Sequence, residues 1–119
     1  MATEPFNSEN MMIRIAVLEI EEEYLDEYLA ILKEESEASI RLEPGVICIY
    51  PMFEKERPTE IRLLEVYANK AAYEIHLKSP HFIEYKTRTA NMVKSLDLID
   101  MSAIDEASMP KLFRKLNTN

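Results

Sequence analysis

An acid and a phenol on one predicted strand, followed by two histidines, are the side chains of this sequence best suited to catalysis. Glu65 and Tyr67 are two positions apart, so on a strand they point to the same face. His76 and His81 are the only histidines of the chain and lie on the helical segment that follows. If that segment packs back over this face, the four side chains meet in one pocket, as polar groups do in small-molecule sites.

These residue types suit proton transfer. A neutral imidazole, with a reference pKa of about 6.5, can accept a proton near neutral pH, and we expect His76 to be this base. Glu65 can orient the imidazole or bind a substrate hydroxyl, and Tyr67 can donate to a developing oxyanion. Structural roles are the alternative: an ion pair of Glu65 with Arg14 or Arg88, a core position for Tyr67, and capping of helix carbonyls by His76.

Other kinds of site have little support in the sequence. His76 and His81 are five positions apart across a predicted helix break, unlike the one-turn spacing of the H-E-x-x-H motif, so no metal site is predicted. The acidic residues Glu34, Glu35 and Glu37 are interpreted as a solvated helix face. Because the sequence has neither a glycine-rich phosphate loop nor a nucleophile elbow, we predict no flavin, nicotinamide or other cofactor.

The composition is typical of one globular domain. The chain has 119 residues, of which 47% are hydrophobic and 30% charged. The formal net charge of -8 would repel a phosphate backbone, so nucleic acid is not an expected partner. No apolar run approaches the roughly 20 residues of a membrane helix, and the polar N-terminus has no signal-peptide features, so we expect a cytoplasmic protein without membrane partners. Cys48, the only cysteine, is expected to be a small buried hydrophobe.

Apolar periodicity and turn residues predict the element order βαββαβ. Strands are expected over 12–20, 46–53, 60–68 and 95–101. An amphipathic helix is expected over 22–42, a short helix after the N-cap Asn69, and another with Ser79 as N-cap and Pro80 in the first turn. Gly45, the only glycine, ends the first helix at a place where we expect a positive φ.

This order is the split βαβ plan of a ferredoxin-like α+β subunit with an antiparallel sheet. Such a sheet has helices on one face only, and its other face is too apolar for water, so we predict a homodimer that buries sheet against sheet, with Tyr50 or Cys48 near the interface. The chain is divided into a disordered N-terminal segment over 1–10, the folded domain over 11–104, and a C-terminal tail with a short helix over 105–119.

The motif Glu65-x-Tyr67, followed by His76 and by the run 79–82 (Ser-Pro-His-Phe), resembles the antibiotic biosynthesis monooxygenase (ABM) family. The resemblance runs from about Met12 to Met101 and includes a turn similar to the family's at 43–46 (Glu-Pro-Gly-Val). It implies a dimeric α+β barrel of ferredoxin-like subunits.

The resemblance also implies a cofactor-independent monooxygenase that acts on a small aromatic or quinol-like compound. Triplet oxygen reacts slowly with closed-shell organic molecules, so such an enzyme needs a substrate that becomes an electron-rich anion, and the protein supplies a base and a dry pocket. The residues expected in these roles are His76, Glu65 and Tyr67 in catalysis, and Leu63, His81 and Phe82 in substrate binding.

Tyr67 leaves other activities open. Quinol-oxidising and haem-degrading members of the family usually carry Trp at this place, and this sequence has no Trp. Haem-degrading members also need an Asn where this sequence has Leu63, so haem is not expected. Tyr67 with the Ser-Pro-His run is similar to members that process a phosphorylated autoinducer sugar derivative, which implies an isomerase or degrading enzyme for a small hydroxyketone. A non-catalytic dimeric binding module is the third possibility.

Overall fold

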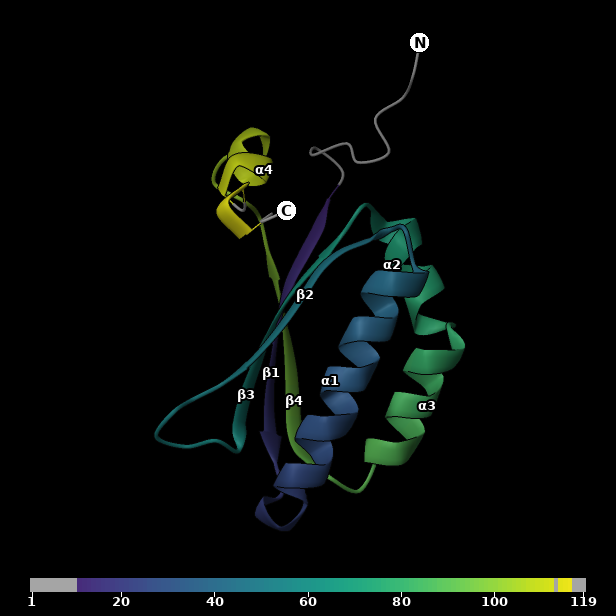
Figure 1. The fold of residues 1–119 in the computed structure, drawn as a ribbon, viewed down its shortest axis with the longest axis vertical. Helices are drawn as coiled ribbons and strands as arrows, with labels where there is room; N and C mark the ends of the chain where they lie inside the picture. The colour runs from purple at the N-terminus through teal and green to yellow at the C-terminus, as the bar shows by residue number, and fades with distance from the viewer. Residues whose placement is uncertain (1–10, 113, 117–119) are drawn as a thin grey trace.

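In the computed structural model, which describes residues 11–112 and 114–116, four strands form one antiparallel sheet with helices on one face (Figure 1). The strands are β1 (Met12–Ile20), β2 (Val46–Phe53), β3 (Glu60–Tyr67) and β4 (Val93–Met101). Their order in the sheet is β2-β3-β1-β4. The predicted ferredoxin-like α+β fold is thereby confirmed, whereas the predicted disordered segment 1–10 lies outside the described residues.

The strand register decides which side chains face the helices. β1 pairs with β3 so that Arg14 lies opposite Glu65 and Ala16 opposite Leu63. These side chains, with Tyr67, point to the helix-covered face, because alternate residues of a strand share one face. Glu65 and Tyr67 are therefore on the same face, as predicted.

Three helices cover this face: α1 (Leu25–Leu42), α2 (Lys70–Leu77) and α3 (Pro80–Thr89). The first helix begins about one turn later than predicted, because residues Glu22–Tyr24 form the 3-10 turn η2 instead of the first turn of α1. Asn69 accepts a hydrogen bond from the amide of Ala72 at 2.8 Å and Ser79 accepts one from the amide of Phe82 at 3.3 Å, so both predicted N-caps are confirmed. α1 and α3 lie side by side over the sheet (Figure 1).

Gly45 is required for space and not for backbone conformation. The predicted positive φ is wrong, because Gly45 does not have a positive φ. A Cβ atom at this position would lie 2.5 Å from the Cβ of Ala72 on α2. The carbonyl of Gly45 also accepts a hydrogen bond from the amide of Ala68 at 2.8 Å. The glycine thus allows the turn after α1 to approach the start of α2 closely.

The main core lies between the sheet and α1. It includes Ile20 and Ile61 from the strands and Tyr28, Ile31 and Leu32 from the helix, all of them buried. Burial of these side chains fixes α1 on the sheet and leaves the space beside α2 and α3 less filled.

The opposite face of the sheet has no helix. Tyr50 and Met52 on β2 and Ile99 and Met101 on β4 are exposed there, and Cys48 is only half-buried, contrary to its predicted burial. Burial nevertheless raises the pKa of the Cys48 thiol, which keeps it protonated at neutral pH.

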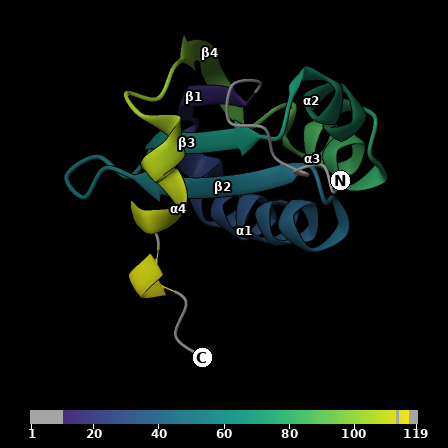
Figure 2. The same ribbon diagram turned by 90° about the horizontal axis from the view of Figure 1, so that it is seen from above.

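After β4 the chain forms three short helical turns, η3 (Glu106–Ser108), α4 (Met109–Leu112) and η4 (Arg114–Leu116). Both ribbon views place α4 away from α2 and α3 (Figures 1 and 2). Among the described residues, none of the helices has the length and apolar character required to cross a bilayer.

Candidate functional site

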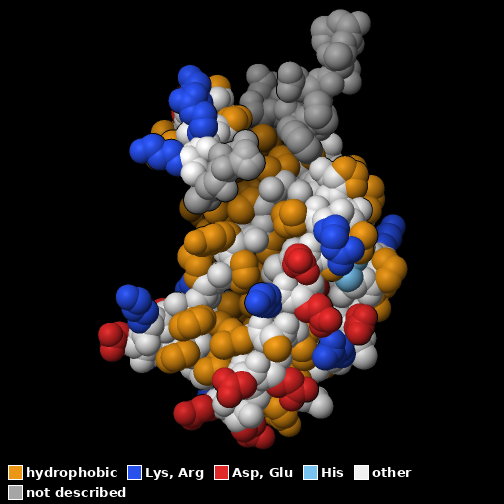
Figure 3. All heavy atoms as spheres, viewed as in Figure 1, with side chains coloured by type: hydrophobic (Ala, Val, Ile, Leu, Met, Phe, Trp, Pro, Cys, Tyr) orange, Lys and Arg blue, Asp and Glu red, His pale blue; other side chains and the backbone are white. Residues whose placement is uncertain are grey.

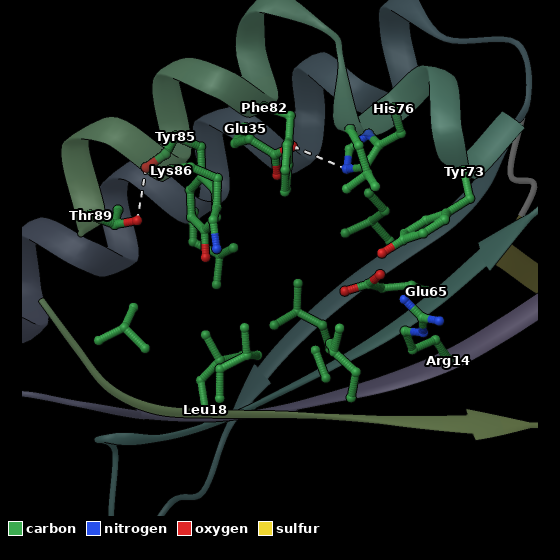
Figure 4. Close-up of a pocket in the computed structure, with 18 of the residues that line it drawn as sticks. Arg14, Leu18, Glu35, Glu65, Tyr73, His76, Phe82, Tyr85, Lys86 and Thr89 are labelled. Carbon is green, nitrogen blue, oxygen red and sulfur yellow. Dashed lines mark hydrogen bonds and ion pairs between the residues drawn. The ribbon is translucent and has the colours of Figure 1, made fainter.

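A pocket of about 470 Å³ lies between the helix-covered face of the sheet and the three helices (Figure 4). Ala16, Leu18 and Leu63 form its floor on the sheet, and Leu32 and Phe82 form part of the opposite wall. A cavity of this size with mainly apolar walls is suited to a small organic molecule.

Most of the predicted site residues line this pocket. Glu65 and Tyr67 reach it from β3 and His76 from α2, together with Leu63 and Phe82. The structure therefore brings the three predicted catalytic side chains to one cavity.

His81 has a different position from the one we expected. It does not line the pocket but lies behind His76, with the two ring centroids 6.2 Å apart. Its Nε2 contacts the carboxylate of Glu43.

Glu65 and Tyr67 form a hydrogen-bonded pair on the pocket floor. The hydroxyl of Tyr67 donates to Glu65 Oε1 at 2.9 Å. Burial raises the pKa of Glu65, opposed by this hydrogen bond and by the charges of His76 and Arg14. Burial and the neighbouring Glu65 also raise the pKa of Tyr67, so the phenol keeps its proton at neutral pH.

The structural alternative for Glu65, an ion pair with Arg14, is not the main contact of this arginine. Its guanidinium bonds to Asp100 Oδ1 at 3.0 Å and lies over the ring of Tyr73, 4.7 Å from the centroid. Glu65 is thus held by Tyr67, beside an arginine that is paired with Asp100. Figure 4 shows Glu65 next to Arg14 and Tyr73.

His76 is buried in the pocket wall between two carboxylates. It is 3% exposed, its Nδ1 lies 2.9 Å from Glu43 Oε2, and its Nε2 lies 3.7 Å from Glu35 Oε2. The ring does not cap the helix, because its Nδ1 is bonded to Glu43 and its Nε2 faces Glu35. With Nδ1–H donated to Glu43, the lone pair of the imidazole is on Nε2, toward Glu35.

Sequence reasoning missed Glu35, and its prediction as part of a solvated face is wrong. Glu35 is 7% exposed and lines the pocket, because it lies on the buried side of α1 with Tyr28, Leu32 and Ser39. Burial raises its pKa, while the hydrogen bond from the Ser39 hydroxyl at 2.8 Å and the charges of the histidines act in the opposite direction. The helical spacing from Tyr28 and Leu32 was the signal that could have identified it.

Sequence reasoning also missed Glu43, which was interpreted only as part of a turn. Glu43 ends α1 and its side chain is buried against both histidines. One of its oxygens, Oε1, is buried without a hydrogen-bond partner among the described residues. No spacing rule in the sequence relates this residue to α2 and α3, so only the fold reveals it.

Further polar groups lie on the pocket wall away from His76. Tyr85 lines the pocket, and its hydroxyl shares a hydrogen bond of 2.6 Å with the hydroxyl of Tyr28, which is buried in the core behind it. Burial raises the pKa of Tyr85 to about 12. Lys86 and Thr89 of α3 also line the pocket (Figure 4). The site therefore combines a held imidazole, two carboxyl groups whose pKa values are raised by burial, and protonated phenols.

Comparison with known proteins identifies the family. A model of the antibiotic biosynthesis monooxygenase family matches residues 11–88. The chain is 48% identical to a Bacteroides thetaiotaomicron protein described as a "putative antibiotic biosynthesis monooxygenase", with a TM-score of 0.82 over 83% of this chain and 94% of the other. No curated protein matches the chain.

Two further solved structures extend the comparison. A Lactobacillus acidophilus protein described as a "putative monooxygenase" is 34% identical with a TM-score of 0.75, and the match covers 76% of this chain but only 43% of that one. A Nitrosomonas europaea structure, 18% identical over 80% of this chain and 91% of its own, has a TM-score of 0.74 and so shares the fold. By the match over residues 11–88 and the 48% identical relative, the chain belongs to the antibiotic biosynthesis monooxygenase family.

Proposed function

We propose that this protein is a cofactor-independent monooxygenase that acts on a small aromatic or quinol-like compound. The observation that carries the proposal is the position of His76 in the wall of an apolar pocket. Its Nδ1 is bonded to Glu43, and its Nε2 faces Glu35, which also lines the pocket. Membership of the family and the two relatives described as putative monooxygenases support the class of reaction.

In this mechanism His76 is the general base. Nε2 accepts a proton from a hydroxyl or an acidic C–H of the substrate, and Glu43 stabilises the imidazolium that forms. Glu65, held by Tyr67, binds a substrate hydroxyl on the pocket floor. The largely apolar walls exclude water and so keep the substrate anion reactive.

The substrate anion then reacts with oxygen directly. It reduces oxygen by one electron, and the resulting radical pair combines to a peroxide at carbon. Loss of water from this peroxide leaves a new carbonyl group, so one oxygen atom enters the product and the other leaves as water with two substrate hydrogens. The electrons come from the substrate, and no outside reductant is required.

A second function, isomerisation or breakdown of a small hydroxyketone, is favoured by the carboxyl groups beside His76. Burial raises the pKa values of both Glu35 and Glu65, so each can carry a proton that an isomerase moves between carbons. Tyr67, where quinol-oxidising relatives usually have Trp, favours the same alternative.

Oxygen consumption with a panel of hydroquinones tests the proposal. We expect uptake by the wild type, a loss of at least 100-fold in His76→Ala, and unchanged uptake in Ile75→Ala, which alters the exposed neighbour on α2. Uptake that persists in His76→Ala contradicts the role of this base. If no quinol supports uptake, interconversion of hydroxyketones followed by NMR distinguishes the isomerase from a pocket that only binds its ligand.

We also propose that the protein acts as a homodimer. The helix-free face has a row of apolar side chains in register across all four strands: Tyr50, Leu64, Ile15 and Ile99. A second copy of the same face would cover this row by sheet-to-sheet packing.

A further inference from the structure

We propose that Glu35, His76 and His81 form a binding site for a divalent transition-metal ion such as Zn²⁺, with Glu43 orienting the imidazoles. The spacing of the two histidines along the chain argued against a metal site. The fold changes this argument, because the third donor comes from α1, and the three residues reach one point from three helices.

The donor atoms are close enough for one ion. One ligand atom from each of Glu35, His76 and His81 lies within 4.8 Å of the others, and His76 Nε2 lies 3.7 Å from Glu35 Oε2. An ion about 2.0–2.2 Å from each donor spans donors roughly 3.3–4.3 Å apart, so small side-chain rotations complete the site. Two imidazoles and one carboxylate are a donor set used by zinc and other borderline metal ions.

Glu43 supplies the outer carboxylate that metal-binding histidines require. Its Oε2 accepts from Nδ1 of His76 and also contacts Nε2 of His81. The bond to His76 fixes the tautomer that has a lone pair on Nε2, the atom that faces Glu35. A single buried carboxylate thus holds both rings in place.

The charge of the cluster favours a cation. Glu35 and Glu43 are both buried, and Glu43 Oε1 has no hydrogen-bond partner among the described residues. A carboxylate that is buried away from water is stabilised by a nearby cation. A dication bound between Glu35 and the two imidazoles would supply this stabilisation.

The site would be open toward the pocket. Glu35 and His76 line the cavity, whereas His81 and Glu43 lie behind them. Three protein ligands leave a coordination position free on the pocket side. If His76 is the base of the proposed function, a bound ion takes up the lone pair of Nε2, so metal binding and proton acceptance exclude each other.

Calorimetric titration of the metal-free, tag-free protein with Zn²⁺ tests the site. We expect one ion per chain, at least 10-fold weaker binding in Glu35→Gln and His81→Gln, and weakening of about 10–100-fold in Glu43→Gln. Two matched controls should bind as the wild type does: Glu37→Gln, which alters an exposed acid on α1, and Cys48→Ser, which removes the only thiol. Absence of one-to-one binding, or equal binding in all variants, overturns the proposal.

A measurement on the unchanged chain guards against variants that fail to fold. Crystals soaked with Zn²⁺ should give an anomalous scattering peak between Glu35 and the two imidazoles, and a peak only elsewhere overturns the site. These results can be distinguished from a failure of the proposed reaction. If the protein consumes oxygen in a reaction that requires His76 but does not bind Zn²⁺, only the metal site is overturned. If it binds Zn²⁺ but turns over no substrate, only the proposed reaction is overturned.

Discussion

Glu65 holds its proton more firmly than an exposed glutamate because the sheet and helices exclude water from its carboxyl group. Its pKa in the folded protein lies above the ordinary value of 4.5. The folded chain therefore binds this proton more tightly than the unfolded chain does, and the associated stability is lost as the pH rises from about 4.5 through the raised pKa.

Replacement of Glu65 by Gln should remove this pH-dependent loss. Gln keeps the shape and can still accept the hydrogen bond from Tyr67, but it has no charge to desolvate. We expect the free energy of unfolding of Glu65→Gln, relative to wild type, to increase between pH 4 and pH 8, because only the wild type has to bury a charge at the higher pH. Denaturant unfolding at both pH values measures this, with exposed Glu37→Gln as the control. A variant less stable than wild type at pH 8 would instead identify Glu65 as an ion-pair partner of Arg14.

The candidate site could be predicted from the sequence only where local geometry relates its residues. Glu65 and Tyr67 were identified because alternation along a strand places them on one face, and His76 because it follows on the next helix. Glu43 is a different case, since its contact with His76 joins residues 33 positions apart and depends on how α1 ends against α2.

At the scale of elements, helix and strand types were predictable and their contacts were not. β1 and β2 have the predicted bounds, whereas β4 begins at Val93, before its expected start at residue 95. Gly45 illustrates the limit: the sequence indicates that a glycine is required after α1, but only the approach of α2 reveals that the reason is space.

The close approach of Gly45 to Ala72 predicts a pair of coupled substitutions. Gly45→Ala should destabilise the protein by roughly 1–3 kcal/mol, because the added methyl group overlaps the Cβ of Ala72. Ala72→Gly removes that methyl group from α2 and should alone cost about 1 kcal/mol. We expect the double variant to be more stable than the sum of the two losses, as for residues in contact. Denaturant unfolding of the four proteins measures this coupling, and strictly additive losses would contradict a steric role for Gly45.

At the scale of the whole molecule, the two faces of the sheet differ in how much of their surface is covered. The helices cover one face and enclose the pocket, while the other face presents the apolar row from Tyr50 to Ile99. Figure 3 shows hydrophobic side chains gathered over the strands and many charged ones on the helical side and at the lower end. A continuous apolar strip of this kind is typical of a protein interface.

Charge placed at the two ends of this row should separate the proposed homodimer. Tyr50 and Ile99 are 58% and 46% exposed, so Tyr50→Glu and Ile99→Glu should leave the fold of each subunit unchanged. In a sheet-to-sheet dimer, each new carboxylate would be buried without a partner, which costs several kcal/mol. We expect a wild-type dimer and monomeric variants by light scattering at micromolar concentration. Ile83→Glu is the matched control, because Ile83 is 52% exposed on α3 and lies off this face. A wild-type monomer, or dimers in all three variants, would contradict the arrangement and require another partner for the helix-free face.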